Sequence, residues 1–381
     1  MKTLFITHHY LSTPGGGAFA SRAYINAFAE LSEYMTLLYP VKEGQNLFDG
    51  LKAGTDLCPV AYDKSKVLKL IHLLTGKVHR YFDMAPAMIL SGKYDTVVFD
   101  TSLVSYRLIA IAKRKGLKTI VIHHNYQYEY FRDNVSGPLR FPTLFWCRHY
   151  EAEAVANADL NLTLTPDDAR LLCEAYGHRG DNFRVLGTFE PFPSVLPGTK
   201  ARNSCGLGRF TITGSLADPQ TERSLIPWIE EFYPVLKSIF PDSELTIAGR
   251  NPSPELGELC EKSGIRLIPS PVSMDPVMEE ADCYICSTSL GGGLKLRVMD
   301  GLKWGLPVLA HKKSARGYEQ FIEHGCMLQY DDLDSFRKAL EKLSRLKLAK
   351  KDICGLYDEI FSFRAGVERL DEILRNSAIK L

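Results

Sequence analysis

Short apolar runs of strand length alternate with longer stretches of helical periodicity over the first half of the chain. Strands are predicted at residues 2–7, 35–39, 94–99, 117–122 and 158–163. Between them, apolar residues recur at helical spacing, as in 19–32 and 144–157. Strands and helices that alternate at these lengths are typical of a parallel, doubly wound α/β sheet.

The same pattern begins again after a proline-rich segment. Pro191, Pro193, Pro197 and Gly198 lie among polar residues up to Asn203, which is typical of a linker. Strands are then predicted at 210–214, 244–248, 265–268, 282–286, 306–310 and 326–329, with helices at 222–239, 255–263, 294–304 and 317–323. We therefore predict domains over 1–190 and 206–355, joined by a linker over 191–205.

One segment of the second domain, from Cys286 to Ala310, combines a strand, a glycine-rich turn and a helix. Backbone N–H groups at such a turn attract anions. Lys295 and Arg297 fall in the predicted first helical turn, where positive charge is unfavourable unless an anion is bound. A phosphate or diphosphate would use both side chains. The alternative is a tight turn with two solvated basic residues.

A second glycine-rich segment follows the first strand. Gly15, Gly17 and Ala20 match the dinucleotide-binding pattern G-x-G-x-x-[GA], but the glycines come eight residues after the strand. The next strand also ends in Pro40-Val-Lys42, without an acid for a ribose hydroxyl. We interpret these glycines as a place where the backbone approaches a polar ligand closely. Ligands of doubly wound sheets bind at the carboxyl ends of strands, so we expect the site in a cleft between two facing domains.

Composition excludes several classes of protein. The chain has 381 residues, a formal charge of +1 and 45% hydrophobic residues, which is typical of a globular protein and argues against binding nucleic acid through a basic surface. Its nine cysteines lack a framework spacing, and with no apolar run long enough to span a bilayer we expect a cytoplasmic protein. Cys283 and Cys286 lie three apart on a strand, so we predict buried thiols and no metal site.

A basic amphipathic segment lies between Asp63 and Arg80, where five Lys and Arg residues alternate with apolar ones. Such a helix can lie on an anionic lipid surface. The alternative is a helix packed on the sheet with a solvated basic face.

Several motifs, taken in order, resemble those of one family. They are Pro14-Gly-Gly-Gly17, His124-Asn-x-x-x-Glu129, Tyr150-Glu-Ala-Glu153, Thr213-Gly-Ser215, Leu245-Thr-Ile-Ala-Gly-Arg250 and the run from Gly291 to Pro307. In this order and spacing they resemble the GT-B glycosyltransferases, specifically the GT4-like (group 1) retaining enzymes of bacterial surface-polysaccharide biosynthesis. The resemblance implies two facing Rossmann-like domains and a C-terminal helix, residues 356–381, that crosses back to the first domain.

The resemblance also implies the reaction. A hexosyl group would move, with retention, from a UDP- or GDP-linked nucleotide sugar to a glycan or lipid-linked acceptor, without a metal or other cofactor. We expect peripheral contact with the inner face of the cytoplasmic membrane.

The site residues follow from the same resemblance. His124, Lys295 and Asp300 would be catalytic, and His123 and Glu129 would contact sugar or acceptor. The donor diphosphate and nucleotide would be bound by Gly15, Gly16, Gly17, Arg250, Val272, Gly291, Gly292, Gly293 and Arg297. The chain departs from the family in one respect, because the paired glutamates of the E-x7-E motif fall on Gly292 and Asp300.

Two other functions stay open. A nucleotide-sugar 2-epimerase uses the same fold, but its chemistry needs more carboxylates and histidines than this chain offers at the strand ends. A non-catalytic nucleotide-sugar-binding protein is consistent with the missing first glutamate.

Overall fold

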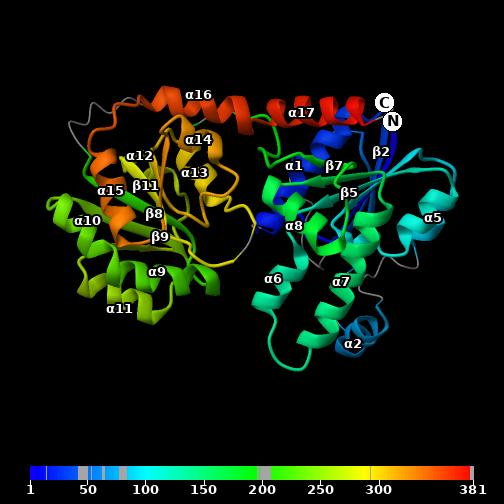
Figure 1. Ribbon diagram of the computed structural model, residues 1–381, viewed down its shortest axis with the longest axis horizontal. Coiled ribbons are helices and arrows are strands. Elements are labelled where there is room, and N and C mark those ends of the chain that lie inside the picture. The colour runs from blue at the N-terminus through cyan, green and yellow to red at the C-terminus, as the bar shows by residue number, and fades with distance from the viewer. Residues whose placement is uncertain are drawn as a thin grey trace. The chain divides into compact units, whose positions relative to one another are not determined.

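The computed structural model describes residues 1–13, 15–41, 50–52, 54–61, 65–76, 84–194, 197, 207–291 and 293–377. The chain divides into two compact units (Figure 1). Unit 1 comprises Met1–Ser194 together with Phe361–Leu381, and unit 2 comprises Val195–Ile360. The C-terminal segment is therefore part of the first unit.

Unit 1 is built on a seven-stranded parallel sheet in the order β3-β2-β1-β4-β5-β6-β7. The strands are β1 (Lys2–Thr7), β2 (Tyr34–Val41), β3 (Asp56–Ala61), β4 (Thr96–Asp100), β5 (Lys118–His123), β6 (Leu160–Thr163) and β7 (Phe183–Val185). Every residue of β4 is buried, as are all but the first of β1 and β5. A strand covered on both faces has apolar residues in succession, which explains why these runs do not alternate.

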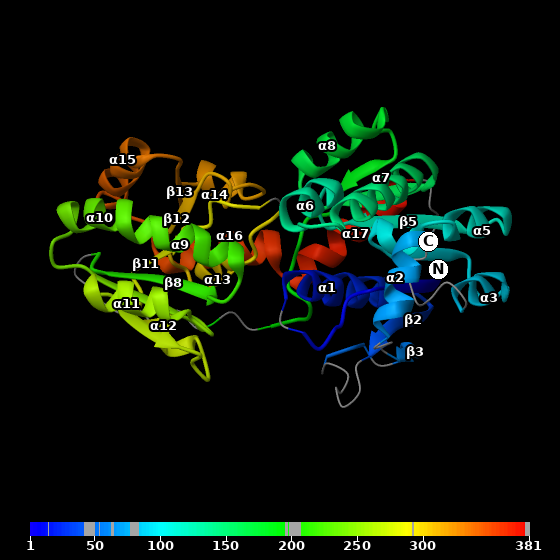
Figure 2. The same ribbon diagram turned by 90° about the horizontal axis from the view of Figure 1, so that it is seen from below.

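Helices cover both faces of this sheet (Figures 1 and 2). They are α1 (Gly16–Leu31), α2 (Lys66–Thr75), α3 (Ala85–Leu90), α4 (Ser102–Ser105), α5 (Leu108–Arg114), α6 (Gln127–Asn134), α7 (Arg140–Asn157), α8 (Pro166–Tyr176) and α17 (Phe363–Asn376). Helix α8 has a regular N-terminal cap, because the Thr165 side chain accepts a hydrogen bond from Asp168 N and Pro166 is the first helical residue.

The C-terminal helix α17 is held on unit 1 by a close backbone approach and a half-buried cation. Gly366 lies against the ring of Phe189, which is fully buried. Arg369 Nε donates to Leu186 O at 2.5 Å and Nη2 donates to Thr188 O at 3.4 Å. The helix thus uses the free carbonyl groups that follow β7, which stabilises its position on this unit.

Unit 2 is built on a six-stranded parallel sheet in the order β10-β9-β8-β11-β12-β13. The strands are β8 (Arg209–Ser215), β9 (Glu244–Arg250), β10 (Arg266–Pro269), β11 (Cys283–Cys286), β12 (Val308–His311) and β13 (Met327–Tyr330). The helices are α9 (Pro219–Glu231), α10 (Tyr233–Ile239), α11 (Pro254–Lys262), α12 (Asp275–Glu280), α13 (Arg297–Lys303), α14 (Glu319–Glu323), α15 (Leu333–Leu343) and α16 (Lys350–Phe361). The prediction of two doubly wound parallel sheets is confirmed.

Two helix predictions in this unit need correction. The helix predicted over 222–239 is two helices, with Phe232 between them and Pro234 in the first turn of α10. Proline lacks the N–H that a continuous helix would use, and its ring favours a helix start. The helix predicted over 294–304 begins only at Arg297, so Lys295 lies before its first turn.

The prediction that Cys283 and Cys286 are buried thiols is confirmed. Cys283 and Cys286 are buried, free thiols on β11. Among the described residues, no helix has the length and apolar character needed to cross a membrane.

The contact between α17 and Phe189 predicts the effect of one methyl group. Gly366→Ala places a Cβ inside the contact distance of the Phe189 ring. We expect it to lower the free energy of unfolding by about 1–3 kcal/mol, because a buried aromatic ring must shift. Calorimetry of the full chain measures the change.

Gly355→Ala on α16 is the matched control, because a Cβ there meets nothing within 4 Å. It should raise stability by about 0.5–1 kcal/mol through helix propensity. Equal effects of the two substitutions would contradict the packing argument.

Candidate functional site

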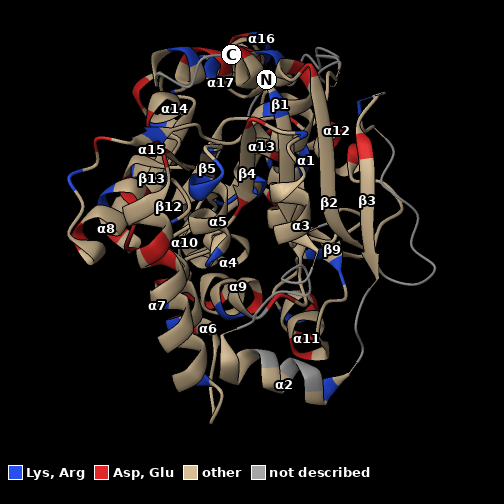
Figure 3. Cartoon of the chain, turned by 90° about the vertical axis from the view of Figure 1, so that its right-hand side faces the viewer, with Lys and Arg blue, Asp and Glu red and all other residues tan. Residues whose placement is uncertain are grey.

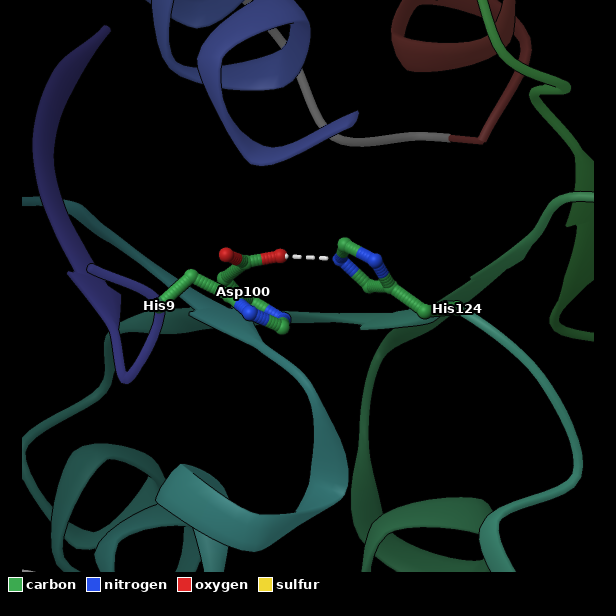
Figure 4. Close-up of side chains that lie close together, drawn as sticks. All are labelled: His9, Asp100 and His124. Atoms are coloured by element: carbon green, nitrogen blue, oxygen red, sulfur yellow. Dashed lines mark hydrogen bonds and ion pairs between the residues drawn. The ribbon is translucent and has the colours of Figure 1, made fainter. Parts of the chain in front are cut away.

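In unit 1, three side chains meet where neighbouring strands end. His9 follows β1, Asp100 is the last residue of β4, and His124 follows β5 directly. Because β1, β4 and β5 are adjacent and parallel, their carboxyl ends share one edge of the sheet. One ligand atom from each side chain lies within 4.8 Å of the others (Figure 4).

Asp100 is the buried centre of this cluster. Its Oδ1 accepts a hydrogen bond from His124 Nε2 at 2.6 Å. Its Oδ2 accepts from Thr7 Oγ1 and Ser21 Oγ, both at 2.5 Å. Burial alone would raise the pKa of Asp100, but the charge and the hydrogen bond of His124 outweigh burial and hold the pKa well below its usual range. The carboxylate is therefore ionised and fully hydrogen-bonded.

The dyad of Asp100 and His124 fixes the orientation of the imidazole. Nε2 carries the proton that is donated to Asp100. In a neutral imidazole, Nδ1 is then the unprotonated nitrogen that can accept a hydrogen bond. Nδ1 of His124 is buried and has no hydrogen-bond partner in the structure. This geometry makes Nδ1 the atom available to a ligand.

Two imidazoles and a carboxylate could also hold a divalent cation such as Zn²⁺. In the structure, His124 Nε2 lies at hydrogen-bond distance from Asp100 Oδ1, and two hydroxyl groups donate to the other carboxylate oxygen. We call the pair of Asp100 and His124 the dyad.

The glycines after β1 lie at the start of α1 beside His9. Gly15 is the N-cap residue with an extended backbone, and Gly16 is the first helical residue. A Cβ at Gly17 would collide with the His9 ring. The sequence predicted that the backbone at these glycines approaches another group closely. Gly17 does so, and the group that it approaches in the structure is the His9 ring.

The other predicted residues of unit 1 lie apart from the dyad. His123 is buried, with Nε2 2.9 Å from Asn161 Oδ1 and its ring stacked near Phe183. Burial lowers the pKa of His123 to about 4, so it is neutral at physiological pH. Glu129 lies on α6, where it pairs with Arg132 at 3.1 Å.

Glu151 lies in the motif Tyr150-Glu-Ala-Glu153, and no function is predicted for it from the sequence. It is fully buried on α7 and accepts hydrogen bonds from Gln127 N at 2.7 Å, Tyr128 N at 3.2 Å and Tyr176 Oη at 2.8 Å. Gln127 and Tyr128 are the first residues of α6, so Glu151 anchors the segment that follows His124. No local sequence signal identifies this role, because Gln127 and Tyr128 lie 24 and 23 residues from Glu151 along the chain.

In unit 2, basic side chains surround the glycine-rich loop before α13. Arg297 Nη2 donates to Thr221 Oγ1 at 2.8 Å, and its guanidinium lies over Gly214, where a Cβ would come within 2.8 Å of Cζ. Burial lowers the pKa of the Lys295 ammonium. Arg250 is exposed at the end of β9, and its carbonyl accepts from Leu216 N at 3.0 Å.

The loop itself requires glycine at two described positions. Gly291 and Gly293 have φ of 77° and 70°, in the left-handed region that favours glycine. A Cβ at Gly291 would also collide with the side chain of Gln220. Gly292 lies outside the described residues.

Asp300 and Val272 are the remaining predicted residues. Asp300 is exposed in the first turn of α13, and Val272 is fully exposed after β10. Both Arg297 and the glycine-rich loop contact helix α9. Arg297 donates to Thr221, and Gly291 lies against Gln220.

Comparison with known families identifies unit 2. Residues 208–345 match the family model described as Glycosyl transferases group 1. This match covers most of unit 2 and shows that this region is similar to the glycosyl transferases of group 1. A sequence search of the curated proteins finds no match.

Solved structures of similar fold extend the likeness to both units. *Anabaena* HepE in complex with UDP has a TM-score of 0.67 at 13% identity, covering 99% of this chain and 100% of that chain. A glycosyltransferase from *Rickettsia africae* has a TM-score of 0.65 at 11% identity, with 99% and 98% covered. The lipopolysaccharide outer core galactosyltransferase WaaB has 0.62 at 10%, with 99% of each chain covered. The chain therefore has the GT-B fold, as predicted.

The buried Glu151 predicts how stability depends on pH. Burial raises the pKa of Glu151 to about 7, and the hydrogen bonds that the carboxylate accepts offset part of this increase. The folded chain therefore binds this proton more tightly than the unfolded chain does. The free energy of unfolding decreases as the pH rises from the pKa of Glu151 in the unfolded chain through about 7.

Glu151→Gln removes this titration. Between about pH 5 and about pH 8, the wild type should lose on the order of 3 kcal/mol of unfolding free energy relative to the variant. Urea unfolding of both proteins at the two pH values measures the difference, and effects of other titrating groups cancel. Parallel pH profiles would contradict the assignment.

Proposed function

We propose that this protein is a retaining glycosyltransferase that moves a hexosyl group from a UDP- or GDP-linked sugar to a glycan or lipid-linked acceptor. We also propose that it acts in the assembly of surface polysaccharide, at the cytoplasmic side of the membrane. The observation that carries the proposal is the group 1 match over 208–345, which contains Arg250 and the glycine-rich loop that leads into Lys295 and Arg297. The HepE structure in complex with UDP supports a nucleotide-linked donor.

Unit 2 would bind the donor diphosphate through side chains and backbone. Arg297 is held by Thr221 and lies over Gly214, so its guanidinium is positioned before a ligand binds. Burial disfavours the charged form of Lys295, and a diphosphate next to the ammonium would offset this cost. Arg250, Lys295 and Arg297 would together neutralise the leaving diphosphate, which replaces a metal ion in this role.

The remaining donor contacts follow the family expectation. Asp300 would accept hydrogen bonds from the ribose hydroxyls, and the backbone at Val272 would contact the base. The exposure of both residues is compatible with ligand contact.

Unit 1 would supply His124 for the transferred sugar. Asp100 holds the proton on Nε2, which leaves Nδ1 to accept a hydrogen bond from a sugar hydroxyl. Retaining transfer has an oxocarbenium-like transition state, and a leaving phosphate oxygen can take the acceptor's proton. His124 would thus orient the sugar, and no separate strong base is required.

A non-catalytic nucleotide-sugar-binding protein is the second candidate, because Gly292 replaces a glutamate of the family motif. An assay for nucleotide release separates the two functions. The transferase releases UDP or GDP faster when acceptor is added, whereas a binding protein releases none.

Lys295→Ala tests the donor site. We expect turnover to fall by about 100-fold or more, because the leaving diphosphate loses a partly buried cation. Nucleotide release from a panel of UDP- and GDP-sugars is the measurement, and circular dichroism checks the fold. The matched control is Lys338→Ala on the exposed side of α15, which should retain wild-type turnover. Wild-type activity of the Lys295 variant would refute the assignment.

Asp100→Asn tests the positioning of His124. The amide keeps the size of the carboxylate but no longer carries the charge that fixes the imidazole proton on Nε2. We expect kcat to fall by about 10- to 100-fold and its pH profile to shift, while the donor Kd measured by calorimetry stays unchanged. A loss of donor affinity with an unaltered pH profile would show that Asp100 acts only on the fold.

A further inference from the structure

The loop between β11 and α13, residues 287–296, carries Lys295 and leads into Arg297. We call it the β11–α13 loop. Its described residues form neither helix nor strand, and Gly291 and Gly293 have positive φ. Ordering such a segment at the moment a ligand binds reduces affinity, whereas a loop that is already held avoids this loss. Contacts that fix the loop before binding therefore bear on the function of Lys295.

Hydroxyl groups hold the first end of the loop. Ser289 N donates to Ser224 Oγ on α9 at 3.1 Å. Ser314 Oγ, which is fully buried after β12, donates to Thr288 O at 2.6 Å. These two contacts fix the backbone directly after β11, well before Lys295 along the chain.

Tyr318 holds the other end of the loop. Its Oη donates to Lys295 O at 3.0 Å, and only 1% of the side chain is exposed. Lys295 O also accepts from Val298 N at 3.0 Å, in the turn with which α13 begins. Tyr318 lies between β12 and α14, and Figures 1 and 3 show these elements and α13 in the same unit. The carbonyl group of Lys295 is thus held from α13 and from the segment after β12.

The hydroxyl group of Tyr318 is more than packing requires. Its ring lies edge-on to that of Phe321, with centroids 6.4 Å apart, and a phenylalanine would fill the same space. Burial raises the pKa of the Tyr318 hydroxyl, so the group keeps its proton and remains a donor. A buried tyrosine hydroxyl needs a hydrogen-bond partner, and this one has the backbone of the β11–α13 loop as a partner.

The position of Lys295 matters because its charged form is disfavoured. Burial is the main cause that lowers the pKa of its ammonium group, and the neighbouring charges of Arg297 and Lys313 lower it further. Such a group neutralises developing negative charge only if it already lies at the right distance when that charge forms. The backbone that carries Lys295 must therefore be fixed.

We propose that Tyr318 is a positioning residue for Lys295. Its hydroxyl group holds the Lys295 carbonyl, so that the ammonium group is in place for the leaving diphosphate. Tyr318 acts through Lys295 and does not itself contact the donor. The chemical consequence rests on the proposed transferase function, whereas the restraint on the β11–α13 loop does not.

Tyr318→Phe removes the hydroxyl group and keeps the ring. We expect kcat for nucleotide release to fall by about 5- to 10-fold and the donor Kd to change by less than about twofold, because the restraint acts on the leaving group. In a Lys295→Ala background, the same substitution should change kcat by less than about twofold, since its effect passes through Lys295. An equal fall in both backgrounds would show that Tyr318 acts only on the fold and would overturn the proposal.

Hydrogen exchange of the full chain tests the restraint without an activity assay. Amides of residues 293–298 should exchange at least about fivefold faster in Tyr318→Phe than in the wild type, because a loop that loses an anchor opens more often. Melting temperatures verify that the variants fold.

Tyr330→Phe is the matched control, because Tyr330 is also 1% exposed and packs in the core of unit 2. It should keep the wild-type exchange of residues 293–298 and the wild-type kcat. Unchanged exchange in Tyr318→Phe, or the same increase in the control, would refute the proposal. If the wild type releases no nucleotide from any donor, the proposed function fails, and the exchange measurement still decides whether Tyr318 holds the loop.

Discussion

The buried carboxylate of Asp100 ties together the elements that form the end of the first sheet. It accepts hydrogen bonds from Thr7 at the end of β1, from Ser21 on α1 and from His124 after β5. A buried charge is expensive unless donors surround it, so these three elements must keep their mutual positions while Asp100 is ionised. The same requirement sets the direction of the His124 ring. The hydrogen bonds that Asp100 accepts therefore hold these elements together and also orient His124.

In unit 2, the candidate site residues are positioned by backbone conformation, whereas in unit 1 they are positioned by a buried charge. The positive φ angles of Gly291 and Gly293 turn the chain between β11 and α13, and Gln220 and Thr221 pack against the loop and Arg297. Helix α13 has only seven residues, so its dipole contributes less than the side chains do. The basic residues and glycines of this loop form the diphosphate half of the proposed donor site.

Much of the fold could be predicted from the sequence because buried parallel strands leave continuous apolar runs. Both sheets and the Thr165 cap follow from such local signals. The break between α9 and α10 was missed although Pro234 marks it. The role of Glu151 was missed for another reason, because its partners Gln127 and Tyr128 lie 24 and 23 residues away and only the fold brings them together.

The histidine pair and α2 illustrate where periodicity stops being informative. Adjacent residues on a strand diverge, so the sequence predicted that one of His123 and His124 would face a ligand, but only Asn161 and Asp100 distinguish them. For α2, the spacing of Val67, Leu70, Ile71 and Leu74 defines a face and leaves its partner undefined. The same spacing occurs in helices that pack on a protein core and in helices that do not, and only the structure shows that these four side chains are exposed. Trp146 and Tyr150 contact Gly76, directly after the helix. The apolar face of α2 therefore remains exposed to solvent in this structure.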